Sequence, residues 1–89
     1  MRGWNYRIMR RETGEEDEPY AFGIHEVYYG YRDKVEGWTV SPMEPHGATM
    51  KDLRADLAMM KKAFTAPVLD HKTGKATPAV RNAREGRGK

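Results

Sequence analysis

The chain contains no cysteine, and this absence limits how a protein of its size can be held together. Chains as short as 89 residues bury only about 60 to 65% of the surface that they expose when unfolded, so many of them depend on disulfides or a bound metal. A disulfide framework and a thiolate metal site are both excluded here. We therefore expect one small domain that is stabilised by packing alone.

The composition is hydrophilic, yet it is not that of a disordered protein. Hydrophobic residues make up 38% of the chain and charged residues 33%. Two Trp, five Tyr and two Phe are too many aromatic residues for a wholly disordered chain. No apolar run has the length of a membrane span or of the apolar region of a signal peptide. These features predict a soluble, cytoplasmic protein that does not associate with membranes.

The charges are divided unevenly along the chain. Residues 1–69 hold ten Lys/Arg and eleven Asp/Glu, a net charge of -1, whereas residues 70–89 hold six Lys/Arg and two Asp/Glu, a net charge of +4. Val80 is the only large apolar residue of the second segment, which therefore cannot bury enough surface to offset its ordering entropy. We expect a small α+β domain over residues 1–69 and a mobile basic tail over residues 70–89.

Three segments of the predicted domain have the composition and alternation of β-strands. They are residues 4–11, 20–31 and 37–41. Four consecutive acidic residues, Glu15 to Glu18, separate the first two segments, and their mutual repulsion predicts an exposed hairpin tip. The pattern therefore predicts a three-stranded antiparallel β-meander.

A helix is predicted after the strands. Thr49 followed by Asp52 is a helix-capping pattern, and Pro67 disfavours helical geometry at the residue before it. Five apolar residues recur at helical spacing and form one stripe, which we expect to cover one face of the sheet. These residues are Met50, Leu53, Leu57, Met60 and Phe64.

One helix covers one face of a sheet, but the segment 20–31 carries bulky residues on both faces. The second face is either covered within the monomer, by a bulge, by strand twist or by Val68 and Leu69, or left open as an interface. An open face would bind a second copy or a different protein. The candidate partner-binding residues are Tyr28, Tyr29, Tyr31 and Trp38 on the sheet, with Glu15, Glu16, Asp17 and Glu18 at the tip.

Every catalytic or ligand-binding motif that the chain suggests is incomplete. His25-Glu26 lacks the second histidine of a zinc-protease helix, because Tyr29 occupies its position. The three histidines fall on a predicted strand, a loop and the tail. Gly74-Lys75 lacks the earlier glycine and the hydroxyl residue of a phosphate loop. The sequence therefore predicts no catalytic residues, no metal and no cofactor.

The segments Trp4-Asn5-Tyr6-Arg7, Ile24 to Tyr29 and Gly37-Trp38-Thr39 together resemble a group of short bacterial and phage-encoded proteins of uncharacterised function. The resemblance covers residues 4–69 and implies no activity. A weaker analogy connects the predicted meander and helix with the HicB-type antitoxin fold, in which a Gly-x-Thr segment opens the helix as Gly47-Ala48-Thr49 does here. Similar modules serve as phage-encoded inhibitors that occupy a partner surface.

Two functions follow from these observations. The first is a non-catalytic interaction protein, antitoxin-like or inhibitor-like, that binds a protein through the aromatic sheet face and the acidic tip. The alternative is a small nucleic-acid-binding module in which exposed aromatic rings stack on bases and the tail contacts phosphates. The tail residues concerned are Lys72, Lys75, Arg81, Arg84, Arg87 and Lys89.

Overall fold

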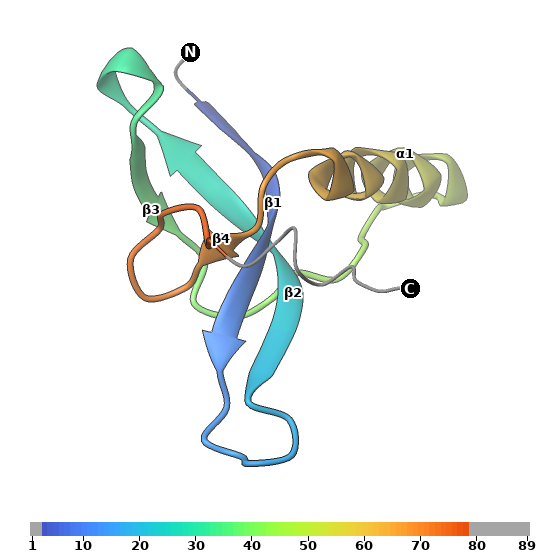
Figure 1. Cartoon of the computed structure of the whole chain (residues 1–89). Helices are drawn as coiled ribbons and strands as arrows, with labels where there is room; N and C mark the ends of the chain where they lie inside the picture. Colours follow the sequence, from blue (N-terminus) through green and yellow to red (C-terminus); the bar gives the residue numbers. More distant parts are fainter. Residues whose placement is uncertain (1–2, 79–89) are drawn as a thin grey trace.

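A computed structural model describes residues 3–78, which form a curled four-stranded sheet with one α-helix against it (Figure 1). The sheet has the strand order β3-β2-β1-β4. Its strands are β1 (Gly3–Glu12), β2 (Tyr20–Tyr29), β3 (Val35–Trp38) and β4 (Leu69–Asp70). The helix is α1 (Met50–Lys61), and the short 3-10 helices are η1 (Tyr31–Asp33) and η2 (Lys62–Thr65). The predicted α+β class is confirmed.

The sheet differs from the predicted antiparallel meander by one strand. β1, β2 and β3 are antiparallel neighbours as expected, but β4 pairs in parallel with β1 through Met9–Leu69 and Arg10–Asp70. The connection from β3 through α1 to β4 is long enough to return the chain in the direction of β1, as parallel pairing requires. The sheet is therefore mixed, and its fourth strand was not predicted.

β1 and β2 form a long hairpin whose register assigns every side chain to a face. Trp4 pairs with Tyr28 and Ile8 with Ile24, so even-numbered residues of both strands share one face. We call this side the helix face, because α1 packs on it, and the opposite side the loop face. The hairpin continues past the helix as an arm (residues 10–22) that ends in the acidic tip, Glu15 to Glu18, the lowest part of Figure 1.

The core on the helix face is small. Tyr6 and Ile8 of β1 pack with Met60 of α1 and Ala63 of η2, and all four are buried. Ile24, Met43 and Val68 pack partly buried around them. The contact involves mainly the C-terminal part of the helix.

The predicted apolar stripe of α1 does not cover the sheet. Met60 is 1% exposed, but Leu57 is 47% exposed and Met50 and Phe64 are each 70% exposed. The helix is rotated so that Asp56, Met60 and Ala63 face the sheet. Leu53 is partly buried, and the other three residues of the stripe lie at the surface. The expectation that all five stripe residues form the core is therefore wrong.

The loop face has its own core, closed within the monomer. Met9, Val27 and Leu69 are buried there, with Tyr29, Val35 and Trp38 packed around them. The segment after β4 lies on this face, since Gly74 contacts the Trp38 ring and Thr77 is buried. The second face is thus covered within the monomer, one of the two predicted alternatives, with Leu69 in its core, whereas Val68 packs on the helix face.

The folded part extends beyond the predicted domain boundary at residue 69. Asp70 belongs to β4, its amide bonds the Lys75 carbonyl, and the Thr77 amide donates to the Val68 carbonyl. Residues 70–78 are therefore packed and are not the start of a mobile tail. The predicted tail residues 79–89 lie outside the described residues.

The position of α1 predicts that two truncations in this helix, Met60→Ala and Leu57→Ala, lower the free energy of unfolding by different amounts. Met60→Ala should lower the free energy of unfolding by about 2 to 5 kcal/mol, because it leaves a cavity in a closed core. Leu57→Ala removes a half-exposed side chain and should cost less than about 1 kcal/mol. Chemical denaturation of both variants measures the difference. A larger loss for Leu57→Ala would contradict the orientation of the helix.

The packing of Gly74 on Trp38 predicts that alanine is more destabilising at Gly74 than at Gly14. A Cβ at Gly74 would stand 2.5 Å from the Trp38 ring, whereas one at Gly14 meets nothing within 4 Å, and both glycines have positive φ. Gly14→Ala should therefore cost only the backbone strain, about 1 to 2 kcal/mol. Gly74→Ala should cost about 1 to 3 kcal/mol more through overpacking. Equal losses in thermal unfolding would show that this loop does not pack on the sheet.

Candidate functional site

The exposed aromatic residues of the hairpin lie on its helix face, on both sides of the area that α1 covers. Trp4 and Tyr28 are 43% and 39% exposed at one end, and Tyr20 and Phe22 are 41% and 62% exposed on the arm. All four are even-numbered residues of the paired strands, and so they project to the same side. Aromatic rings in this number on one face are typical of an interface.

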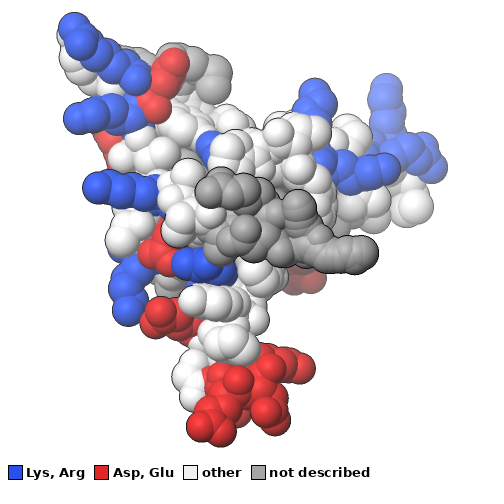
Figure 2. All heavy atoms as spheres, in the orientation of Figure 1, with Lys and Arg blue, Asp and Glu red and all other residues white. Residues whose placement is uncertain are grey.

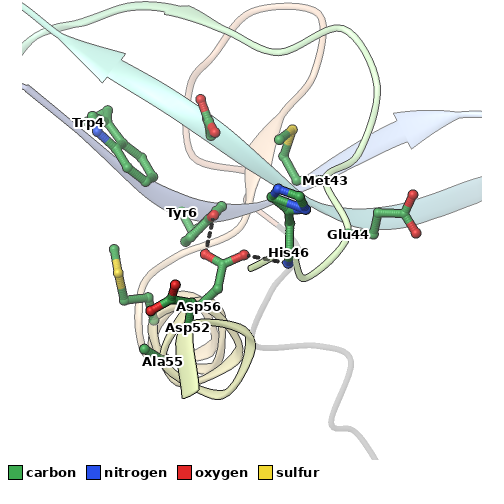
Figure 3. A pocket seen from close by; sticks show the side chains of 10 residues that line it. Trp4, Tyr6, Met43, Glu44, His46, Asp52, Ala55 and Asp56 are labelled. Atoms are coloured by element: carbon green, nitrogen blue, oxygen red, sulfur yellow. Dashed lines mark hydrogen bonds between the residues drawn. The ribbon is translucent and has the colours of Figure 1, made fainter. Parts of the chain in front are cut away.

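At the Trp4 end the surface is hollowed between β1, α1 and the loop before the helix (Figure 3). The cavity has a volume of about 430 Å³. Its walls combine carboxylates with aromatic rings and methionine side chains. The principal lining residues are Trp4, Tyr6, Glu26, Met43, Glu44, Asp52, Asp56 and Met59.

Asp56 joins three of the elements that line the cavity, which are β1, α1 and the loop before the helix. Its Oδ1 accepts a hydrogen bond of 2.6 Å from the Tyr6 hydroxyl, and its Oδ2 accepts one of 2.9 Å from the His46 amide. The Tyr6 hydrogen bond, followed by that from His46, holds the pKa of Asp56 below its ordinary value. Burial and then the hydrogen bond to Asp56 raise the pKa of Tyr6 to about 12. Asp56 is therefore an ionised acceptor that anchors the helix.

The other acidic groups of the cavity are freer to meet a ligand. The Tyr28 hydroxyl donates to Glu26 at 2.6 Å, and this bond raises the pKa of Tyr28. Glu44 is exposed and points away from the Tyr6–Asp56 pair in Figure 3. Trp4 stands edge-on to Tyr6, with 5.1 Å between ring centroids. Carboxylates beside an aromatic face favour a cationic side chain such as Arg or Lys.

The arm presents a second acidic and aromatic surface. The four carboxylates of the acidic tip gather at one extremity of the molecule, at the bottom of Figure 2. Tyr20 and Phe22 follow the tip along β2, and the Arg10 guanidinium lies 4.2 Å from the centre of the Tyr20 ring. Thr13 shapes the turn, since its hydroxyl accepts from the Glu15 amide at 2.9 Å.

The structure divides the four aromatic residues that the sequence grouped as a partner surface. Tyr28 is exposed on the helix face, and Tyr31 is 64% exposed in η1. Tyr29 and Trp38 are half-buried in the core of the loop face, where the Tyr29 hydroxyl donates to Asn5 and accepts from Arg7.

Three residues of this face, Trp4, Tyr20 and Phe22, were not predicted as site residues from the sequence. The signal that could have identified them is the alternation of side chains in the two strands, which places them with Tyr28 on one face of the β1–β2 hairpin. That face is long enough to extend beyond a short helix.

The basic residues of the nucleic-acid alternative are placed only in part. Lys72 and Lys75 are exposed, and Lys72 lies 3.6 Å from Glu12. The other four, Arg81, Arg84, Arg87 and Lys89, lie outside the described residues. The structure adds a group of exposed cations on α1 and η2. These are Lys51, Arg54, Lys61 and Lys62.

Two histidines that are far apart in the sequence meet on the loop face. The rings of His25 and His71 are 5.2 Å apart between centroids, and His25 is only 3% exposed. The Nδ1 atom of His25 lies 2.9 Å from the Thr39 carbonyl oxygen, to which it donates when protonated. Burial lowers the pKa of His25, and the neighbouring His71 and Arg11 add to this effect.

His46 lies on the other side of the sheet, at the Asp56 cavity. Within residues 3–78, no group of three His, Cys, Asp or Glu side chains is arranged to hold a metal ion.

Comparison with protein-family models, with curated proteins and with solved structures found no match to this chain. The resemblances stated from the sequence therefore stay predictions. Of the helices in residues 3–78, none combines the length and the apolar character needed to cross a membrane.

The burial of His25 predicts that acid destabilises the fold below the ordinary histidine pKa of 6.5. Because its pKa is lowered in the folded state, the unfolded chain takes up the proton first as pH falls through 6.5. The free energy of unfolding is therefore highest above that pH and decreases below it. Urea denaturation at about pH 7.5 and about pH 5.5 measures the decrease.

His25→Asn, which keeps a donor near Thr39, should flatten this dependence, and His46→Gln, at an exposed position, should not. If both variants keep the full decrease, another group causes it.

Proposed function

We propose that the chain is a non-catalytic interaction protein, antitoxin-like or inhibitor-like, that binds a protein partner through the helix face of its hairpin and the acidic tip. The observation that carries this proposal is the grouping of four exposed aromatic side chains on one face, with carboxylates at each end of it. Aromatic side chains anchor interfaces because they bury a large area at a low cost in rotamer freedom.

The charges on this face favour a basic partner. At the Trp4 end, Glu26, Glu44 and Asp52 line the cavity, and at the other end the acidic tip projects into solvent. A basic protein surface is attracted to both ends, whereas a phosphate backbone is repelled by them. This arrangement supports the protein-binding function over the nucleic-acid alternative.

The cavity is suited to a single side chain of the partner. Its volume of about 430 Å³ is within the range of clefts that hold small molecules, so it has room for one side chain. An arginine or lysine inserted there would lie against the Trp4 ring and pair with Glu26 or Glu44. Asp56 takes no part in this binding, because its two oxygens already accept hydrogen bonds from Tyr6 and His46.

Peptide titrations test the proposal. The wild-type protein should bind an arginine-rich peptide, measured by fluorescence anisotropy, and should not bind the same peptide with glutamate in place of arginine. Trp4→Ala should weaken binding by at least about tenfold, or about 1.4 kcal/mol. Val40→Ser is the matched control, since Val40 is 78% exposed and outside the hairpin face. A thermal melt of each variant shows that it is folded.

Oligonucleotide titrations provide the opposing outcome. The nucleic-acid alternative replaces this proposal if two results are found together. Single-stranded DNA binds with a steep salt dependence, and the wild-type protein, Trp4→Ala and Val40→Ser all bind the peptide with the same affinity.

A further inference from the structure

The side of α1 and η2 that faces away from the sheet is apolar and basic. Leu57, Met50 and Phe64 recur every seven residues, so they lie along one side of the helix, and they are 47%, 70% and 70% exposed. Arg54 and Lys61, three residues before and four residues after Leu57, border this row on one side. Lys51 and Lys62 extend the basic border, and Figure 2 shows Lys and Arg side chains over the helix.

In the part of the chain that the structure describes, the cations of this surface have no acidic partner. Within residues 3–78, the ion pairs are Arg10–Asp70 and Lys72–Glu12, and neither includes a residue of the helix. The two acidic residues of α1 line the cavity on the sheet side, and one of them, Asp56, is bonded to Tyr6. The outer surface of the helix therefore carries unbalanced positive charge around an apolar row.

The arm of the same chain has the complementary character. Its acidic tip carries four carboxylates, and Tyr20 and Phe22 stand exposed beside them. The arm and α1 project from the sheet in different directions in Figure 1, so the tip does not reach its own helix. A second copy of the chain could supply each surface with its complement.

We propose that the protein forms a twofold dimer in which the arm of each protomer lies on the outer surface of the partner's α1. The acidic tip pairs with the basic border, and Phe22 and Tyr20 cover the row of Met50, Leu57 and Phe64. A twofold axis repeats this contact, so the dimer buries two arms and two helices at once. This inference rests on the proposed function, because it names the partner of the arm, and it leaves the Trp4 cavity open to another protein.

Charge argues against the simpler dimer in which two α1 helices pack through their apolar rows. Arg54 and Lys61 border the row, so two such helices would bring four basic side chains together. No acidic residue borders the row to relieve this repulsion, since Asp52 and Asp56 face the cavity. An acidic arm over the same row makes favourable pairs instead.

Sedimentation velocity of the full chain tests the dimer. The wild-type protein should sediment with twice the chain mass at high micromolar concentration and should dissociate as salt is raised. A tip variant with Glu15, Glu16, Asp17 and Glu18 changed to Lys should be monomeric, and so should a helix variant with Lys51, Arg54, Lys61 and Lys62 changed to Glu. Mixing the two variants should restore a dimer, because each contact then joins opposite charges.

A monomeric wild-type protein overturns the inference, and so does a mixture of the two variants that stays monomeric while both are folded by circular dichroism. A helix variant that still dimerises shows a different interface and also overturns it. Trp4→Ala separates this inference from the proposed function, since it should weaken peptide binding by at least about tenfold and leave the dimer intact. Peptide binding by a wild-type monomer would support the function and reject the dimer.

Discussion

The alternation of side chains along β1 is the constraint on which the structure depends. Tyr6 and Ile8 project to one face and begin the core beneath the helix, while Met9 projects to the other and begins the core beneath the loop. β2 and β4 pair with the two edges of this strand. One ten-residue strand thus organises two cores, and a shift of its register by one residue would exchange them.

Dividing the apolar residues between two faces leaves each core small, and the placement of the helix follows from this. Only Met60 and Ala63 from the segment of α1 and η2 are buried on the helix face, and the hydrogen bond from Tyr6 to Asp56 supplements them. Burial of a side chain such as Met60 contributes about 1.5 to 3 kcal/mol. The helix is consequently attached at its C-terminal end, and much of its apolar row has no partner within residues 3–78.

Local signals in the sequence predicted the elements well. Thr49 caps α1, its hydroxyl accepting from the Asp52 amide, and the segment of α1 and η2 ends before Pro67 as expected. The alternation of the first two strands and the hairpin tip were also correctly placed, but the third strand, predicted at residues 37–41, lies at Val35–Trp38. These features depend on neighbouring residues only, and for that reason they can be predicted from a single sequence.

The orientation of α1 and the role of residues 70–78 could not be predicted in the same way. A period of 3.6 residues identifies one side of a helix as apolar but does not say what covers it, and here most of that side is exposed. Residues 70–78 looked like a tail because they have no large apolar side chain. They pack through Gly74, whose missing Cβ makes room for Trp38, and through His71 against His25. Such fits depend on partners that are distant in the sequence.

The candidate site likewise combines features set by consecutive residues, which could be predicted, with features set by residues distant in the sequence, which could not. The acidic tip was evident from four consecutive residues, but the cavity combines β1 and β2 with a loop and a helix that follow them by dozens of residues. Its aromatic wall was also missed, because Trp4 alternates in the strand pattern like a core residue. It is exposed because the buried contact of α1 and η2 with β1 lies at Tyr6 and Ile8 and does not include Trp4.

Opposite charges lie on separate parts of the fold, and this separation affects how the protein distinguishes its partners. The acidic tip and the cations of α1 lie on different projections of the molecule, so they do not neutralise one another within a protomer. Opposite charges attract partners to both projections, and salt weakens that attraction wherever it acts. Charge alone therefore cannot select between a second copy and a foreign protein. The aromatic residues can, because Phe22 and Tyr20 need an extended apolar row, whereas Trp4 and the cavity need one cationic side chain.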